Sequence, residues 1–377
     1  MARIDKSLFV FGGNSMAQQR LTLAIAPAQV YRGWQITAEY MPQSRTLVIA
    51  SPSALGLLQT LSLPDTCRMA LPVRGCTELN LAAMLAEVQK HSPTWLVGAG
   101  GGRVLDLAKL VAYRADLPLV TVPTSAATCA AWTALSNVYE ESGAFAYDVP
   151  LPCAPQQLIV DYALIQKAPV RMLIAGIGDA LAKWYEASVS SGHSDQTMII
   201  AAVQTARILR DLLLQQSAEA IATPGGKPWQ EVVDAVVCLA GVIGGIGGAD
   251  CRTVAAHAIH NALTHHPNAH GALHGEKVAY GILVQLRLEE VHGNQLAATA
   301  RQQLRELYRS LGLPQTLADL GLGHLSREEQ YNLAAIACRP NSDIHRLPFT
   351  VTPTEVLEAM ESTTSATTSK AAVESAS

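Results

Sequence analysis

The chain has 377 residues, of which 49% are hydrophobic and 15% are charged, and a formal net charge of −4. This length predicts two domains with ample apolar material for their cores. The acidic balance argues against a nucleic-acid or anionic-membrane partner, which would require a basic face. No uninterrupted apolar run reaches the ~18 residues of a membrane span, and the first residues show no signal-peptide core. We therefore expect a cytoplasmic protein whose seven scattered cysteines are reduced thiols.

Strand and helix patterns alternate from residue 21 to residue 165, whereas residues 1–20 show no convincing periodicity. This rhythm predicts a parallel sheet covered by helices on both faces, in an α/β domain over residues 1–165. A hairpin is expected within the same domain at 136–149. The individual strands are predicted at 46–51, 94–100, 118–124 and 156–162, and the helices at 78–91 and 102–115.

Helical periodicity replaces the alternating pattern after residue 166. It predicts an all-α second domain over residues 166–360. The remaining segment, 361–377, is rich in Ser, Thr and Ala and poor in apolar residues, so we predict that it is disordered. The predicted helices are 172–190, 196–221, 228–245, 252–265, 275–291, 293–311 and 326–337.

The segment GAGGGRVLD at 98–106 lies between a predicted strand and a predicted helix. Glycines at such a turn let backbone amides approach a ligand, and the helix N-terminus offers unpaired N–H groups to phosphate. A tight turn that binds nothing fits the pattern equally well, because the spacing differs from GxGxxG. A second cluster, GVIGGIGG at 241–248, has no strand before it and predicts close helix packing.

Histidines concentrate in one stretch, AAHAIHNALTHHPNAHGALHGEK at 255–277, which holds six of the 11 in the chain. Such a cluster fits a metal site, because neutral imidazole is a common ligand. Taken alone, it fits an accidental histidine-rich surface loop as well. Whether this stretch binds a metal therefore depends on whether further ligand residues occur elsewhere in the chain.

Four ordered motifs resemble the iron-containing alcohol dehydrogenase superfamily, and most closely its glycerol dehydrogenase branch. They are GGGRVLDLAK (100–109), VPTSAATCAAWTALS (122–136), GIGDALAKWYEA (176–187) and HAIHN…LHGEKVAYG (257–281). The resemblance covers roughly residues 21–355. It implies a Rossmann-like parallel-sheet domain followed by an all-α domain, the architecture of dehydroquinate synthase. Metal, cofactor and substrate would meet in the cleft between the two.

The resemblance implies that Asp179, His257 and His274 are the metal ligands. Two histidines and one carboxylate leave room for substrate, which suits Zn²⁺ or Fe²⁺. His260, one helical turn after His257, would face the active site, either as a proton relay or in a structural hydrogen bond. The remaining three, His265, His266 and His270, are expected to be solvated loop residues.

Two departures from the glycerol dehydrogenase pattern concern the substrate. Cys129 stands where an aspartate typically contacts substrate hydroxyls. The chain therefore lacks a hydrogen-bond acceptor for a polyol, and it also lacks a negative charge that would repel an anionic substrate. Lys183 and Arg252 add cations near the expected metal, and Arg can hold a carboxylate in a bidentate manner. Plain ion pairs, of Lys183 with an acid on its own helix and of Arg252 near a helix start, are the alternatives. Segments around Cys129 and Asp179 also resemble the hydroxycarboxylate dehydrogenase A type, which reduces 2-oxo acids with NADPH.

A third departure concerns the cofactor. NAD-preferring relatives usually place Asp after the second strand, where it binds the ribose 2′-hydroxyl, and this chain has Ser51 there. We therefore expect NADP(H) or NAD(H) as cofactor, with one divalent metal. The cofactor-binding residues implied by the resemblance are Ser51, Gly101, Gly102, Arg103, Asp106, Thr124, Thr133, Leu135 and Tyr139.

The sequence thus predicts a metal-dependent oxidoreductase that interconverts a 2-oxo acid and a 2-hydroxy acid, with a small-molecule substrate and a homo-oligomeric state. The first alternative is a glycerol (polyol) dehydrogenase. A second is a sugar-phosphate cyclase, which would need several phosphate-binding cations near the site. A non-catalytic metal- or nucleotide-binding relative is a third, which the complete Asp/His/His set argues against.

Overall fold

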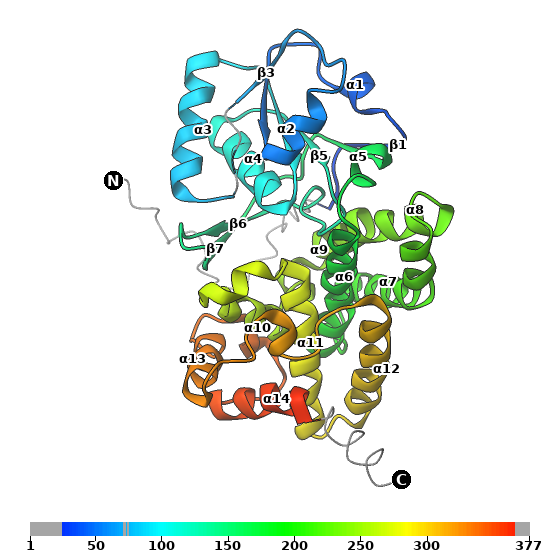
Figure 1. Ribbon diagram of the computed structural model, residues 1–377, viewed down its shortest axis with the longest axis vertical. Coiled ribbons are helices and arrows are strands. Elements are labelled where there is room, and N and C mark those ends of the chain that lie inside the picture. The colour runs from blue at the N-terminus through cyan, green and yellow to red at the C-terminus, as the bar shows by residue number, and fades with distance from the viewer. Residues whose placement is uncertain (1–24, 71–72, 74, 366–377) are drawn as a thin grey trace, which may run out of the picture.

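Figure 1 shows an α/β part and a helical part that follow each other along the long axis of the molecule, in a computed structural model that describes residues 25–70, 73 and 75–365. The larger sheet consists of β1 (Gln29–Gly33), β2 (Thr46–Ala50), β3 (Cys67–Met69), β4 (Trp95–Gly100), β5 (Leu119–Pro123) and β8 (Gln157–Asp161). Its order is β1-β8-β5-β4-β2-β3, and every neighbouring pair is parallel. The predicted parallel-sheet fold is therefore confirmed.

Helices cover both faces of this sheet because its strands are apolar on both sides. Leu47 and Ile49 of β2 pack in one core cluster with α3 (Glu78–His91) and α4 (Gly102–Ala115). Val48 of the same strand points the other way, into a cluster with α2 (Pro52–Leu58) and α5 (Tyr162–Ile165). Successive side chains of a strand alternate between faces, so one strand contributes to both cores.

The short elements of this part were not predicted from the sequence. They are β1, β3, α1 (Thr37–Tyr40), α2 and α5. The predicted hairpin is present as β6 (Leu135–Tyr139) and β7 (Phe145–Pro150), which pair antiparallel in a separate sheet. Its tip reaches the helical part, because the Phe145 backbone amide donates to Thr264 Oγ1 at 2.8 Å.

The rest of the described chain is mainly helical, as predicted, although the helix α14 (Pro353–Ser365) was not among the predicted helices. The helix α11 is central: fourteen of its residues are buried, and it packs against α6, α10, α12 and α14. A helix surrounded in this way is apolar on every side except where polar side chains find partners. The helices are α6 (Val170–Ser191), α7 (Thr197–Ala222), α8 (Lys227–Asp234), α9 (Ala240–Gly247), α10 (Ala255–Leu263), α11 (His274–Val291), α12 (Gln295–Leu311), α13 (Arg327–Ala337) and α14 (Pro353–Ser365).

One helical stretch of the described chain, Lys227–Cys251, is long and apolar enough to cross a membrane by length and composition alone. Half of its most apolar window is buried inside the protein, which is what a core helix shows as well. Its glycines permit close packing, as predicted. A Cβ at Gly241 would lie 2.4 Å from the Trp132 ring, and one at Gly245 would lie 2.4 Å from the Ile25 carbonyl oxygen.

The predicted disorder of the segment 361–377 is wrong at its start. The helix α14 continues through Ser365, and Thr363 is buried with its hydroxyl donating to the Met360 carbonyl at 2.7 Å. Hydroxyl groups that bond backward along a helix make a Ser/Thr-rich sequence compatible with it. Residues 366–377, like residues 1–24, lie outside the described chain.

Gly281→Ala is expected to lower the free energy of unfolding by about 1–3 kcal/mol. A Cβ at Gly281 of α11 would lie 2.3 Å from the Ala256 carbonyl oxygen of α10, so the helices must separate. Gly56→Ala in α2 is the matched control, because its Cβ would meet nothing within 4 Å. That change should stabilise by about 0.5–1 kcal/mol. Urea unfolding of both variants checks this, and equal effects would contradict the packing explanation.

Candidate active site

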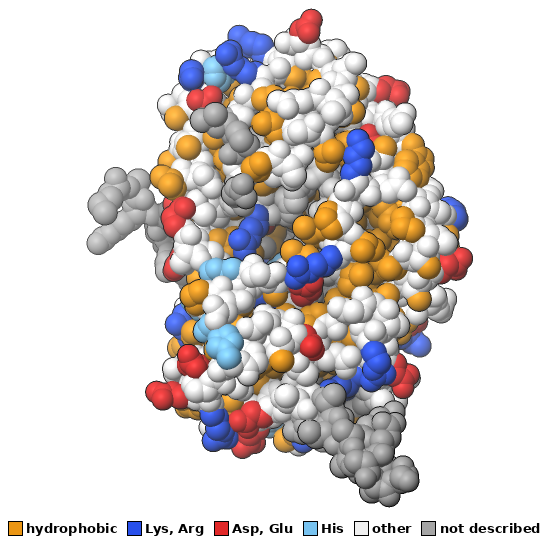
Figure 2. Space-filling view, viewed as in Figure 1, with side chains coloured by type: hydrophobic (Ala, Val, Ile, Leu, Met, Phe, Trp, Pro, Cys, Tyr) orange, Lys and Arg blue, Asp and Glu red, His pale blue; other side chains and the backbone are white. Residues whose placement is uncertain are grey.

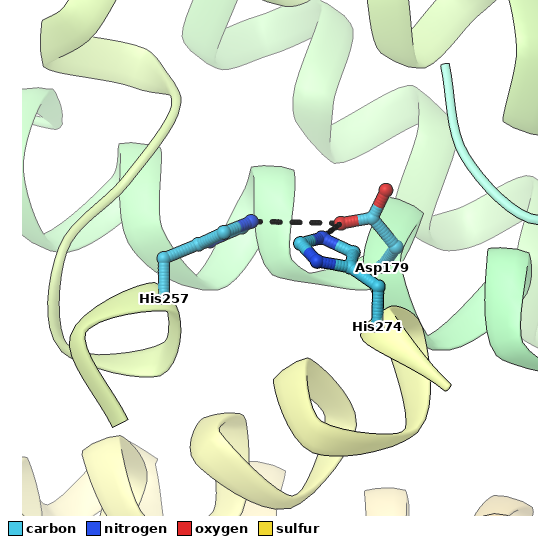
Figure 3. Close-up of side chains that lie close together, drawn as sticks. All are labelled: Asp179, His257 and His274. Atoms are coloured by element: carbon cyan, nitrogen blue, oxygen red, sulfur yellow. Dashed lines mark ion pairs between the residues drawn. The ribbon is translucent and has the colours of Figure 1, made fainter. Parts of the chain in front are cut away.

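Three helices bring together the three predicted metal ligands. Asp179 lies in the middle of α6, His257 in the first turn of α10, and His274 is the first residue of α11. Figure 3 shows the two imidazole rings directed toward the same carboxylate oxygen. His257 Nε2 lies 3.5 Å from Asp179 Oδ1, and His274 Nε2 lies 3.3 Å from it. One potential ligand atom of each residue falls within 4.8 Å of the others.

This arrangement fits a divalent metal ion. Two ligand atoms bound at about 2.1 Å in a tetrahedral site lie roughly 3.4 Å apart, close to the observed separations. Asp179 Oδ1 is buried, and no hydrogen bond from the described residues reaches it. A buried carboxylate oxygen without a hydrogen bond is costly unless a cation binds it. Two imidazoles and one carboxylate suit Zn²⁺ or Fe²⁺.

The protonation of the triad follows from its burial and mutual contacts. Burial alone would raise the pKa of the Asp179 carboxyl, but the rings of His274 and His257 hold it well below its usual range, so it is ionised. Burial opposes protonation of His257, yet Glu186 and Asp179 raise its pKa to about 9. A metal at this site must therefore displace a proton from His257, and binding should strengthen as pH rises toward that value.

The prediction for the other histidines of the stretch 255–277 is confirmed only in part. His260 is buried beside the triad, with its ring centroid 4.1 Å from that of His274 and its Nδ1 2.9 Å from Asn261 Oδ1. Burial holds the pKa of His260 well below its usual range, so its ring is neutral. His266 and His270 instead form local hydrogen bonds around a short 3₁₀ helix, Pro267–Gly271. His270 is exposed, as predicted, whereas His265 and His266 are partly buried and His265 lines the cleft.

The glycine turn has the predicted strand-turn-helix form. The strand β4 ends at Gly100, and Gly101 precedes α4 without a capping side chain, so the first amides of this helix are open to a ligand. Arg103, in the first turn, lies over the Tyr139 ring at 4.3 Å. The ends of β2, β4 and β5 meet at this edge, where nucleotides bind in open parallel sheets.

Lys109 lies on α4, the helix that follows the glycine turn, and it was not predicted from the sequence to take part in the site. Its buried ammonium lies 2.9 Å from Asp106 Oδ1 and donates to the carbonyls of Thr133 and Leu135. Asp106 is thus paired with a cation inside the protein, and the pair anchors the segment before β6. The spacing of Asp106 and Lys109, three residues apart on a helix, was the available signal.

A single cleft of about 1170 Å³ joins the glycine turn to the triad. Figure 2 shows basic and histidine side chains near the level at which the α/β part meets the helical part. Every residue assigned to the site from the sequence lines this cleft: Ser51, Gly101, Gly102, Arg103, Asp106, Thr124, Cys129, Thr133, Leu135, Tyr139, Asp179, Lys183, Arg252, His257, His260 and His274.

Arg252 is a partly buried cation of the cleft, with its side chain 17% exposed and with unused hydrogen-bonding capacity. Its Nε is buried and receives no hydrogen-bond partner among the described residues. Its terminal nitrogen lies 3.9 Å from Asp148 Oδ2 of β7, beyond hydrogen-bond distance. Arg346 holds the neighbouring backbone, because it donates to the carbonyls of Ala249 and Thr253. The predicted alternative, an ion pair of Arg252 near the helix start, is present in a long form with Asp148, which leaves the guanidinium without a close partner.

Known proteins resemble this chain over most of its length. Residues 35–162 match the family described as iron-containing alcohol dehydrogenase. An uncharacterized oxidoreductase of Synechocystis sp. is 58% identical over 92% of this chain and 93% of that protein. Hydroxycarboxylate dehydrogenase A of Escherichia coli is 39% identical over 74% and 76% of the two chains, and glycerol dehydrogenase of Pseudomonas putida is 34% identical over 83% and 88%. A probable glycerol dehydrogenase structure from Sinorhizobium meliloti has a TM-score of 0.80 and 30% identity, over 90% and 96%.

The fold, the cleft and these relatives define an oxidoreductase of the NAD-dependent dehydrogenase class. The chain belongs to the iron-containing alcohol dehydrogenase family. The resemblance seen in its motifs is thereby confirmed. The family is NAD(P)- and metal-dependent, and the triad of Asp179, His257 and His274 is the candidate site for that metal.

Proposed function

We propose that this enzyme interconverts a 2-oxo acid and the corresponding 2-hydroxy acid by hydride transfer, with NAD(P)H and one divalent metal, Zn²⁺ or Fe²⁺. The proposal rests on Arg252, which lines the cleft with a partly buried guanidinium whose Nε is buried and has no hydrogen-bond partner among the described residues. A partly buried cation with free donors favours an anionic ligand, and guanidinium matches the two oxygens of a carboxylate. A 2-oxo acid presents that carboxylate next to the carbonyl to be reduced.

Different residues of the cleft have different roles in the proposed reaction. Asp179, His257 and His274 would hold the metal, and Arg252 binds the substrate carboxylate and so orients the neighbouring carbonyl. When bound, the metal supplies Lewis-acid polarisation of the substrate oxygen and the nicotinamide supplies the hydride. His260 is neutral, and with its Nδ1 bonded to Asn261 Oδ1 its Nε2 is free to exchange a proton.

Cys129 favours an anionic substrate because it carries no negative charge. Burial raises the pKa of its thiol, so the group stays neutral in the cleft wall. An aspartate at this place would repel a carboxylate by ~1 kcal/mol or more at contact distance. Lys183, 6% exposed, lies one helical turn beyond Asp179 on α6 and adds positive charge to the same region.

Polyol oxidation is the second candidate, with glycerol as substrate and dihydroxyacetone as product. Asp148 favours it, because its half-exposed carboxylate lines the cleft and can accept hydrogen bonds from hydroxyl groups. The relatives named glycerol dehydrogenase support it too. The two candidates differ in the charge of the substrate and share the metal and the nucleotide.

A small substrate matrix separates them. The zinc- or iron-loaded enzyme is assayed by NAD(P)H absorbance with 2-oxoglutarate, 2-oxobutanoate, oxaloacetate, glycerol and dihydroxyacetone, each with both nucleotides. The proposal expects the highest kcat/KM for a 2-oxo acid. A higher kcat/KM for glycerol or dihydroxyacetone would overturn it in favour of the polyol dehydrogenase.

We also propose that the enzyme accepts NADPH, and Ser51→Asp tests this. Ser51 Oγ caps α2 by accepting from the Ala54 amide, and aspartate caps equally well, so the fold should persist. The new carboxylate would repel a 2′-phosphate and favour the free ribose. The ratio of kcat/KM for NADPH to that for NADH should fall about tenfold or more, or ~1.4 kcal/mol. Thr77→Asp, the same change at the cap of α3, should leave the ratio unchanged.

A further inference from the structure

The start of α10 lacks a capping residue of its own. Val254 occupies the cap position and its side chain cannot accept a hydrogen bond. The open amides are satisfied from outside the helix instead. The amides of Val254 and His257 both donate to Glu186 Oε1, at 2.7 Å and 2.9 Å, and the Ala256 amide donates to Gln285 Oε1 at 3.1 Å. Two side chains distant in sequence thus complete this helix.

The second oxygen of Glu186 reaches the ring of His257. Glu186 Oε2 lies 2.5 Å from His257 Nδ1, and the opposite ring atom, Nε2, is the one that faces Asp179. An ionised carboxylate can only accept, so Nδ1 must carry the proton of this contact. Nε2 of a neutral ring is then left with its lone pair directed at the ligand cluster.

Glu186 and Gln285 also connect the three helices that carry the ligands. Glu186 follows Asp179 by seven residues on α6, which is about two turns and returns it to the same face. Gln285 lies on α11 with His274 and donates to the Tyr185 carbonyl of α6 at 2.8 Å. Both side chains are 0% exposed, so water cannot replace them. The network therefore fixes how α6, α10 and α11 present their ligands.

We propose that Glu186 is a positioning residue that selects the Nδ1–H form of His257 and holds its Nε2 toward the metal, while Gln285 completes the same helix start. Metal-binding histidines commonly need such an acceptor on the second ring nitrogen, and its loss typically costs 10–100-fold in metal affinity. The proposal concerns the metal site and holds whichever substrate the enzyme uses. A merely structural carboxylate would cap α10 without affecting the ring.

Glu186→Gln separates the two roles. The amide oxygen can still accept from the Val254 and His257 amides, whereas the amide nitrogen would face Nδ1 and oppose its proton. We expect the zinc affinity, measured by competition with a chromophoric chelator, to fall about 10–100-fold. Asp161→Asn is the matched control, because Asp161 is a buried carboxylate that accepts from the backbone amides of Gln35 and Thr37 in the α/β part. Its zinc affinity should change less than about threefold.

A spectroscopic measurement on the unmutated protein supports or overturns the proposal independently of any variant. In zinc-loaded wild type labelled with ¹⁵N-histidine, two-bond ¹H–¹⁵N spectra should show His257 protonated at Nδ1 and metal-bound at Nε2. Zinc on Nδ1, or an Nδ1 without a proton, would overturn it. Wild-type zinc affinity in a folded Glu186→Gln protein would overturn it as well. If that variant does not fold, the wild-type spectrum alone decides.

Discussion

Asp179→Asn is expected to abolish tight metal binding and to lower kcat by about 1000-fold or more. The substitution keeps the size of the side chain but replaces the charged oxygen on which His257 and His274 converge. Loss of a Lewis acid removes several kcal/mol of transition-state stabilisation, and each ~1.4 kcal/mol is tenfold in rate. Metal content of the purified protein and kcat under saturating substrate are the two measurements.

The matched control for this prediction is Asp234→Asn. Asp234 is a partly buried aspartate of the helical part that bonds Tyr162 and Arg32, outside the cleft. Its variant should retain metal and kcat within about threefold, even if stability falls. Metal-stripped wild type provides the converse experiment: activity should be lost and should return when Zn²⁺ or Fe²⁺ is added. Full activity in the stripped, folded enzyme would contradict the assignment of the triad.

The sequence predicts the larger elements of this fold well because their periodicity is strong. The helices at 78–91 and 102–115 have the predicted bounds, and the glycine turn between β4 and α4 lies where strand, glycines and helix follow each other. The edge strand β1 was missed because none of its five residues is buried, so it has no apolar run, and the edge strand β3 was missed because it has only three residues. They are strands because they pair with β8 and β2. Tertiary pairing decides such segments.

The three candidate metal ligands could be predicted from the sequence, whereas Glu186 could not. The candidate ligands Asp179, His257 and His274 could be predicted because ordered motifs resemble a family, and not because of their spacing. Glu186 could not be found in the same way, since its role depends on the packing of α6 against the start of α10. A charged residue seven positions after a ligand looks like any other helical glutamate until the fold buries it.

Arg252→Ala is expected to raise KM for a 2-oxo acid such as 2-oxobutanoate by about 30-fold or more, and KM for dihydroxyacetone by less than about threefold. Loss of one partner from a buried charge pair costs about 2–5 kcal/mol, and ~1.4 kcal/mol corresponds to tenfold in affinity. The uncharged ketone makes no such pair, so the difference between the two substrates isolates the carboxylate. Steady-state kinetics with the metal-loaded variant gives both values.

Arg339→Ala is the control that tests whether the effect on KM is specific to Arg252. Arg339 lines the same cleft but is exposed, so its charge is screened and its removal should raise KM for the 2-oxo acid only a few-fold. A large effect at Arg252 with a small one at Arg339 would place the substrate carboxylate at the partly buried guanidinium of Arg252. Equal increases for the acid and the ketone at Arg252 would instead mean that this residue shapes the cleft. An anionic substrate would then no longer be supported, whereas the metal triad would be unaffected, because the two depend on different residues.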